Sequence, residues 1–203
     1  MAALAPLRYI FGSQEQSEVI YDLVINEEHV QLRHYHSYHV AKIRVESDED
    51  GQNRETAYMR LLNYVLGKNS RSEPIDPMMP LIQEDVAARM TALIRLEHHD
   101  VDPHLTAFEV SMILPKELTE QTAPLPLDPE IQILKVKPHL TAAVRFRGLC
   151  GQRKQTRLSK YLRLWLHDKG YMAASAPRLA KYNHPLTLPF LRRNELHIDV
   201  VKR

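Results

Sequence analysis

The sequence predicts an α+β protein built from two copies of one strand–helix–strand–strand unit. The first observation is an internal repeat, because residues 29–45 match residues 130–146. The matched pairs are Val30/Ile131, Gln31/Gln132, Leu32/Ile133, Ala41/Ala142, Ile43/Val144 and Arg44/Arg145. The second is that a helical pattern and then another strand pattern follow each copy. Two such βαββ repeats predict pseudo-two-fold symmetry and a distorted antiparallel β-barrel flanked by two main helices.

The strands are predicted from alternation. Each matched segment alternates apolar and polar residues and is interrupted near its middle, by Ser37 in one copy and Pro138 in the other. This pattern indicates a pair of short strands joined by a tight connection. The segments 106–114 and 194–201 alternate in the same way and are expected to close the two copies.

The two main helices are predicted from apolar stripes with a period of 3.6 residues. Residues 54–66 carry one stripe and residues 156–169 carry the other. Gly67 and Gly170 follow them. Glycine is the residue expected where the chain adopts a left-handed conformation after a helix, so both positions indicate C-caps.

The repeat also divides the chain. We expect a single domain over residues 20–201, with repeat one at about 20–115 and repeat two at about 130–201. A proline-rich connector, 115–129, separates them, and residues 1–19 form an N-terminal extension. The hydrophobic share of 44% and the charged share of 26% are ordinary for a globular protein.

Composition excludes several classes of protein. The net charge is +2 and Lys and Arg form no long block, so no nucleic-acid partner is predicted. The lone Cys150 excludes an internal disulfide. No stretch approaches the ~18 uninterrupted apolar residues that a membrane span needs, and the N-terminus lacks the features of a signal peptide. We therefore expect a cytoplasmic protein without a membrane partner.

Short motifs occur in an order that resembles the SOUL/heme-binding protein family. They are Arg33-His34-Tyr35, Tyr64-Val65-Leu66-Gly67-Lys68-Asn69, the proline-rich Pro124 to Pro129, Tyr182-Asn183-His184-Pro185 and Arg192-Arg193-Asn194-Glu195. Together they cover roughly residues 20–201. The chain is also similar, more distantly, to gyrase-inhibitor-like ligand-binding domains, which share the architecture.

The resemblance implies a non-catalytic protein that buffers or carries heme or another porphyrin. The cofactor would lie in a shallow cleft between the first helix and the sheet, with His34 as its candidate axial ligand. The implied pocket residues are Tyr58, Leu61, Leu62, Val65, Leu188 and Phe190, of which the last two belong to a C-terminal lid. The implied propionate contacts are Arg54, Lys68 and Arg192.

Departures from the family motivate a second hypothesis. The family's Met-Thr strand motif corresponds either to residues 77–78, where this pair is lost, or to 90–91, and the positions of some members' basic residues hold Glu55, Asn63 and Leu188. These changes favour a gyrase-inhibitor-like domain that binds an unknown protein partner or a non-porphyrin small molecule.

The sequence also contains candidates for two further kinds of site. A hydrolase would use a carboxylate on a closing strand, with Glu109 and Glu195 as the candidates. Histidines cluster at 34–39 and 98–104, but neither cluster has the fixed spacing of a strong zinc motif. We therefore predict no metal apart from a heme iron at His34.

Overall fold

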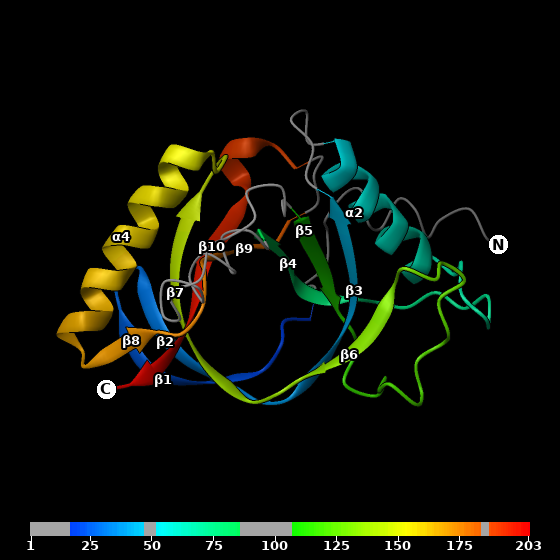
Figure 1. Cartoon of the computed structure of the whole chain (residues 1–203), viewed down its shortest axis with the longest axis horizontal. Helices are drawn as coiled ribbons and strands as arrows, with labels where there is room; N and C mark the ends of the chain where they lie inside the picture. Colours follow the sequence, from blue (N-terminus) through cyan, green and yellow to red (C-terminus); the bar gives the residue numbers. More distant parts are fainter. Residues whose placement is uncertain (1–16, 47–51, 86–106, 184–186) are drawn as a thin grey trace, which may run out of the picture.

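The protein forms one antiparallel sheet that is curled into a half-barrel and carries two helices (Figure 1). This computed structural model describes residues 17–46, 52–85, 107–183 and 187–203, without the side chains of Arg54 and Pro189. The alternative motif position at 90–91 and the histidines at 98–104 lie outside the described residues.

The elements follow one another in a regular order. The first five strands are β1 (Tyr21–Glu27), β2 (Val30–Tyr35), β3 (Tyr38–Glu46), β4 (Met78–Asp85) and β5 (Ala107–Ile113). The other five are β6 (Gln132–Val136), β7 (His139–Arg147), β8 (Tyr171–Ala173), β9 (Arg178–Lys181) and β10 (Arg193–Lys202). The helices are α2 (Gln52–Val65), α4 (Gln152–Asp168) and the short η1 (Pro189–Leu191). Both predicted main helices and both closing strands are therefore present, with small differences at their ends.

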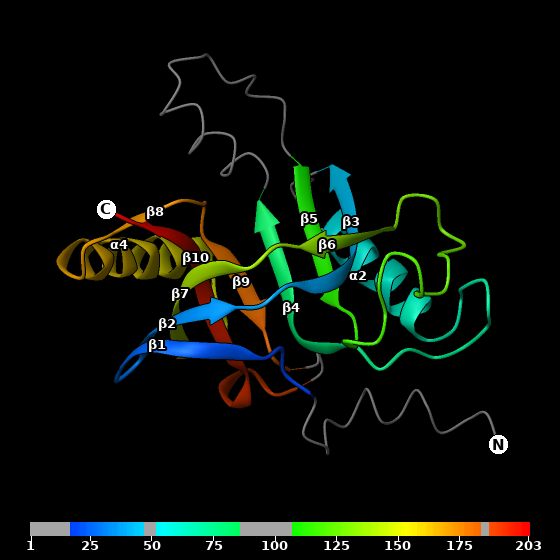
Figure 2. The same ribbon diagram turned by 90° about the horizontal axis from the view of Figure 1, so that it is seen from below.

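The short strands on either side of Ser37 do not pair with each other. β2 instead pairs with β7 and β3 pairs with β6, so that Tyr35 lies opposite His139 and Tyr38 lies opposite Val136. The chain therefore runs almost straight through each connection and passes from one half of the sheet to the other (Figure 2). The expected tight connection is a bend in a long two-stranded ribbon rather than the turn of a hairpin.

The expected barrel is an open half-barrel. The strands follow the order β1-β2-β7-β10-β9-β4-β5-β3-β6, with β8 attached to β10. Within the described ranges no pairing joins the edge strands β1 and β6, and the sheet stays open between them. The predicted distorted barrel is therefore a half-barrel, and the α+β class, the antiparallel sheet and the two helices are confirmed.

Both helices pack on the outer face of the curl. α2 lies on β3 and β5, and α4 lies on β7, β8 and β10 (Figure 1). Each helix buries one apolar stripe, with Leu61 and Val65 of α2 and Leu162 and Leu166 of α4 almost completely buried. The two larger hydrophobic cores consequently lie between sheet and helices, and a smaller cluster of Val19, Tyr35, Val40 and Ile113 lies on the concave face.

The glycines after the helices have the predicted conformation. Gly67 has φ = 105° and Gly170 has φ = 77°, which is the left-handed region that glycine adopts at little cost. These residues therefore end the two helices and turn the chain back toward the sheet.

Replacement of Leu61 by alanine should strongly destabilise the fold. Leu61 has no exposed surface and sits in the core under α2, so its loss should lower the free energy of unfolding by about 2–5 kcal/mol. Met59 of the same helix is 47% exposed, and Met59→Ala should change it by less than about 0.5 kcal/mol. Urea denaturation of both variants measures the difference. Equal effects would show that α2 does not pack as described.

Candidate functional site

A buried ion pair lies on the concave face of the sheet. Arg33 on β2 donates hydrogen bonds to both carboxylate oxygens of Glu195 on β10, at 2.6 and 3.0 Å. Their side chains are 3% and 0% exposed. Arg193 adds a second cation, 3.1 Å from Glu195 Oε1. Since a buried charge without a partner is costly, these groups hold each other in place.

Two further groups complete the hydrogen bonds of Glu195. The Tyr182 hydroxyl donates to Oε2 at 2.8 Å, and His197 Nε2 lies 2.9 Å from the same oxygen. Burial opposes ionisation of Glu195, but the hydrogen bonds from His197 and Arg33 outweigh it and hold its pKa well below the ordinary value of 4.5. Complete burial lowers the pKa of His197 despite the nearby carboxylate. Both lowered pKa values are consistent with a neutral His197 that donates a hydrogen bond to an ionised Glu195.

Aromatic rings line the concave face beside this network. Tyr35 stacks on His139 with 5.5 Å between ring centroids, and it lies 6.3 Å from both Tyr38 and His197. Burial raises the pKa of Tyr35 to about 12 and that of Tyr38 to about 12. Both phenols therefore stay protonated at neutral pH and remain able to donate hydrogen bonds.

These rings surround a small cavity of about 70 Å³. Its lining includes Tyr35, Tyr38, His139, His197 and Arg178. Arg178 is ion-paired with Asp199, yet its buried Nε has no hydrogen-bond acceptor among the described residues. A buried donor of this kind is normally satisfied by water or by a ligand.

The predicted pocket on α2 divides into two parts. Leu61 and Val65 are completely buried in the core between helix and sheet, so they are not open to a ligand. Tyr58 and Leu62 are only partly buried and pack at the margin of that core. The exposed Met59 and the partly buried Leu66 lie beside them at helical spacing. We call Tyr58, Met59, Leu62 and Leu66 the α2 apolar flank.

The predicted lid and propionate contacts do not gather at α2. Leu188 and Phe190 are 56% and 66% exposed, and η1 packs against β7 in the other half of the sheet. Arg192 belongs to the same region, where its Nε donates to the Thr187 carbonyl. Lys68 is exposed directly after α2, and the Arg54 side chain is outside the described part. Of the predicted cations with described side chains, Lys68 alone is close in sequence to the α2 apolar flank.

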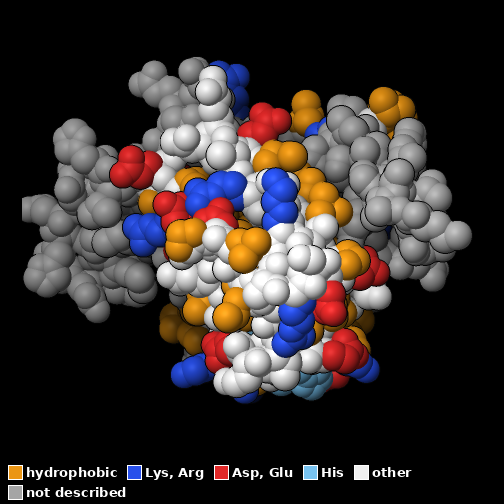
Figure 3. Space-filling view, turned by 90° about the vertical axis from the view of Figure 1, so that its right-hand side faces the viewer, with side chains coloured by type: hydrophobic (Ala, Val, Ile, Leu, Met, Phe, Trp, Pro, Cys, Tyr) orange, Lys and Arg blue, Asp and Glu red, His pale blue; other side chains and the backbone are white. Residues whose placement is uncertain are grey.

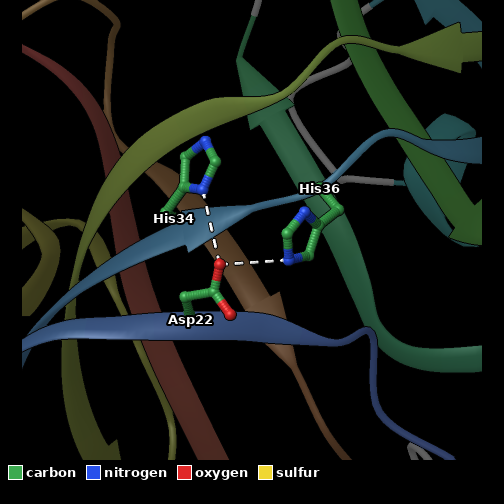
Figure 4. Close-up of side chains that lie close together, drawn as sticks. All are labelled: Asp22, His34 and His36. Atoms are coloured by element: carbon green, nitrogen blue, oxygen red, sulfur yellow. Dashed lines mark ion pairs between the residues drawn. The ribbon is translucent and has the colours of Figure 1, made fainter.

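His34 lies in another part of the molecule. It is on β2, whose neighbours are β1 and β7, whereas α2 packs on β3 and β5. Its Nδ1 is 3.7 Å from Asp22 Oδ2, and His36 Nε2 is 3.1 Å from the same oxygen (Figure 4). The third histidine of the sequence cluster, His39, pairs with Lys135 on the far side of the bend.

The two carboxylates of the hydrolase hypothesis both face cations. Glu109 accepts a hydrogen bond from Lys42 at 2.8 Å, as Glu195 does from Arg33. A general base works best when its pKa is near the working pH, whereas the pKa of Glu195 lies far below neutral pH. Burial raises the pKa of the Cys150 thiol, which disfavours a reactive thiolate. The geometry fits structural roles for Glu195 and Cys150.

The sequence alone did not predict that Arg33, Tyr182, Glu195 and His197 meet on the concave face, although part of the signal was visible. On β10 the apolar Leu196, Ile198 and Val200 alternate with Glu195, His197 and Asp199. That alternation predicts two faces, but it does not say whether the polar face meets solvent or closes on other polar residues. The partners from β2, β7 and β9 could not be assigned without the strand order.

The curled sheet with two outer helices places the chain in a class of α+β half-barrels with several solved members. The EcmrR C-terminal domain has a TM-score of 0.57 and 13% identity, with 91% of this chain and 99% of that chain covered. A hydrolase from Listeria innocua has a TM-score of 0.57 and 9% identity, with coverage of 88% and 94%. EcmrR in its DNA complex has a TM-score of 0.60 and 11% identity, with coverage of 86% and 57%. These likenesses show the fold.

Within that class, the family model of the SOUL heme-binding protein matches residues 8–199. The chain therefore belongs to the SOUL heme-binding protein family, as the order of its motifs predicted. No curated protein matches the chain significantly. Among the described residues, no helix is long and apolar enough to cross a membrane.

The Glu195 network should make stability depend on pH. As the pH falls, unfolded His197 takes up a proton below its ordinary pKa of 6.5 and unfolded Glu195 below 4.5, while the folded groups resist. The free energy of unfolding should therefore be highest above about pH 7 and should decrease steadily as the pH falls.

The variant Glu195→Gln isolates the carboxylate. It leaves Arg33 buried without its counter-ion and should lower the free energy of unfolding by about 3–5 kcal/mol near neutral pH. This cost should stay constant down to about pH 4.5 and shrink below it, where unfolded Glu195 takes up a proton and the wild type loses its advantage. Urea denaturation at about pH 7.5, 5.5, 4 and 3 measures both effects. A cost that stays constant down to about pH 3 would exclude an ionised Glu195 as its source.

Proposed function

We propose that the protein binds heme or a related tetrapyrrole without catalysing a reaction on it, and so buffers or carries the pigment. Membership of the SOUL heme-binding protein family carries this proposal. The lowered pKa of Glu195 and the raised pKa of Cys150 agree with a non-catalytic role.

The α2 apolar flank is the binding surface that we propose. A porphyrin needs a flat apolar surface and cationic or hydrogen-bonding groups for its propionates. Met59 is 47% exposed, Tyr58 and Leu62 are accessible in part, and the exposed Lys68 follows the helix. On the side of the molecule that carries α2, hydrophobic side chains reach the surface between charged ones (Figure 3).

Two other locations suit a porphyrin less well. The concave cavity of about 70 Å³ is much smaller than the roughly 300–1,000 Å³ pockets of drug-sized ligands. His34 is accessible, but it contacts Asp22 and His36 rather than the α2 apolar flank. We therefore do not assign iron ligation to His34, and we expect its removal to leave the heme spectrum unchanged.

We further infer that residues 20–201 form one domain whose halves are related by pseudo-two-fold symmetry. Strand register supports this inference. Leu32 pairs with Ala142, and their repeat partners Ile133 and Ala41 pair with each other. The closing strands agree with this symmetry. Glu109 lies opposite Arg44, and Glu195 lies opposite Arg145, which is the repeat partner of Arg44.

Hemin titration tests the proposed surface. The wild-type protein should give a saturable Soret change. Met59→Glu places a carboxylate on the α2 apolar flank and should weaken hemin binding at least about tenfold. Leu164→Glu changes a residue of α4 that is 60% exposed and serves as the matched control, with unchanged affinity.

His34→Ala completes the comparison. Its hemin spectrum should match that of the wild type if the porphyrin lies along α2. A changed Soret band in this variant, together with unchanged hemin binding by Met59→Glu, would indicate that the porphyrin binds at β1 and β2 instead. No saturable change with the wild-type protein would refute tetrapyrrole binding altogether.

The concave cavity favours a second candidate function, the binding of a small non-porphyrin molecule. The observation behind it is the buried Nε of Arg178, which lacks an acceptor among the described residues and belongs to a side chain that lines the cavity. A compact ligand with a hydrogen-bond acceptor and a planar group would satisfy this donor and stack on Tyr35 or His139.

Native mass spectrometry of the purified protein tests this second function. A bound molecule smaller than a porphyrin should be found, and it should be lost in Tyr38→Ala but kept in Met59→Glu. Finding porphyrin as the only bound species, or a small molecule that Tyr38→Ala retains, would count against it.

A further inference from the structure

We propose that Asp22, His34 and His36 bind a divalent transition-metal ion, for which Zn²⁺ is the best fit. The three side chains converge on the outer face of β1 and β2 (Figure 4). Asp22 lies directly opposite His34 in the β1–β2 register. His36 follows two residues later, just beyond the end of β2, and its imidazole turns toward the same carboxylate.

The distances suit tetrahedral coordination. Zinc bonds to imidazole nitrogen and carboxylate oxygen are about 2.0–2.2 Å, so two ligand atoms in a tetrahedral site lie roughly 3.4 Å apart. Asp22 Oδ2 is 3.1 Å from His36 Nε2 and 3.7 Å from His34 Nδ1, and all three donor atoms lie within 4.8 Å of one another. Small side-chain rotations therefore bring three donors to a common centre.

The donor set indicates the class of metal. Two imidazoles and one carboxylate form a borderline set, which favours zinc and its neighbours in the first transition row over Mg²⁺ and Ca²⁺. Asp22 and His36 are 64% and 58% exposed, so solvent can enter and supply the fourth ligand. A three-ligand site of this kind stays open to water, unlike a closed structural zinc site.

The surroundings leave the carboxylate available to a metal. Among the described residues, no Lys or Arg lies within ion-pairing distance of Asp22, and its two ion-pair contacts are both to histidine. An exposed contact between a carboxylate and a histidine adds little to stability. The backbone that carries two of the donors is firm, because β2 is hydrogen-bonded to both β1 and β7.

Zinc titration of the full-length protein, freed of metal by a chelator and without hemin, tests this site. Calorimetry should find one Zn²⁺ per chain, and Co²⁺ used as a probe should give the visible absorption of a tetrahedral site. Loss of an outer partner alone typically costs about 10–100-fold in metal affinity, so Asp22→Asn and His36→Ala should each weaken zinc binding at least about tenfold.

Two controls separate this site from unspecific binding by other histidines. His29→Ala removes an exposed histidine before β2 and should leave zinc binding unchanged. A variant in which His98, His99 and His104 are replaced by alanine should also retain it. Equal affinity in the wild type, Asp22→Asn and His36→Ala would overturn the proposal, as would loss of binding in the His98/His99/His104 variant alone.

The metal site stands apart from the proposed tetrapyrrole function. Asp22→Asn should bind hemin as the wild type does, because Asp22 lies on β1 and the α2 apolar flank on the other half of the sheet. Loss of hemin binding in this variant would mean that one site serves both ligands and would overturn the assignment of a separate metal site.

Discussion

The curl of the sheet depends on the polar groups of its concave face satisfying one another, and the Arg33–Glu195 ion pair is the centre of that arrangement. Both helices cover the outer face, and the two larger hydrophobic cores lie there, while a smaller cluster around Tyr35, Val40 and Ile113 lies on the concave side. The inner face carries charges, phenols and imidazoles that would be costly to bury singly. Because Arg33, Tyr182 and His197 all meet Glu195, strands β2, β9 and β10 are held at fixed positions around it.

This arrangement separates the surfaces that can bind ligands. The concave face carries buried polar groups beside a small apolar cluster and lines a small cavity, whereas the outer face of α2 offers an apolar flank beside a packed core. Asp22, His34 and His36 lie on the outer face of β1 and β2 and belong neither to the concave face nor to the α2 apolar flank. One fold thus presents three chemically distinct surfaces, and a large flat pigment, a compact polar molecule and a metal ion would each select a different one.

Much of the fold could be predicted because its strongest signals are local. The stripes on α2 and α4, the glycines after them and the alternation of β3, β7 and β10 depend on nearby residues alone. β1 has no clear alternation because most of its side chains are exposed, and β8 and β9 are too short to leave a pattern. The open edge and the absence of hairpins at Ser37 and Pro138 depend on long-range pairing, which a single sequence does not reveal.

The candidate site was predicted less completely for the same reason. Tyr58 and Leu62 could be recognised at the margin of the helix stripe, but the complete burial of Leu61 and Val65 depends on which strands lie beneath α2. The lid residues Leu188 and Phe190 were expected near α2, while their neighbour in the structure is β7. The approach of Asp22 to His34 and His36 follows from the β1–β2 register, and β1 was not predicted.

The proposed binding of a tetrapyrrole along α2 can be tested most directly with a diamagnetic porphyrin. Titration of the ¹⁵N-labelled protein with gallium protoporphyrin should shift the amide resonances of Tyr58, Met59 and Leu62 and leave those of the concave face and of β1 unchanged. Shifts confined to the region of Tyr35 and His139, or to the β1–β2 face, would contradict binding along α2.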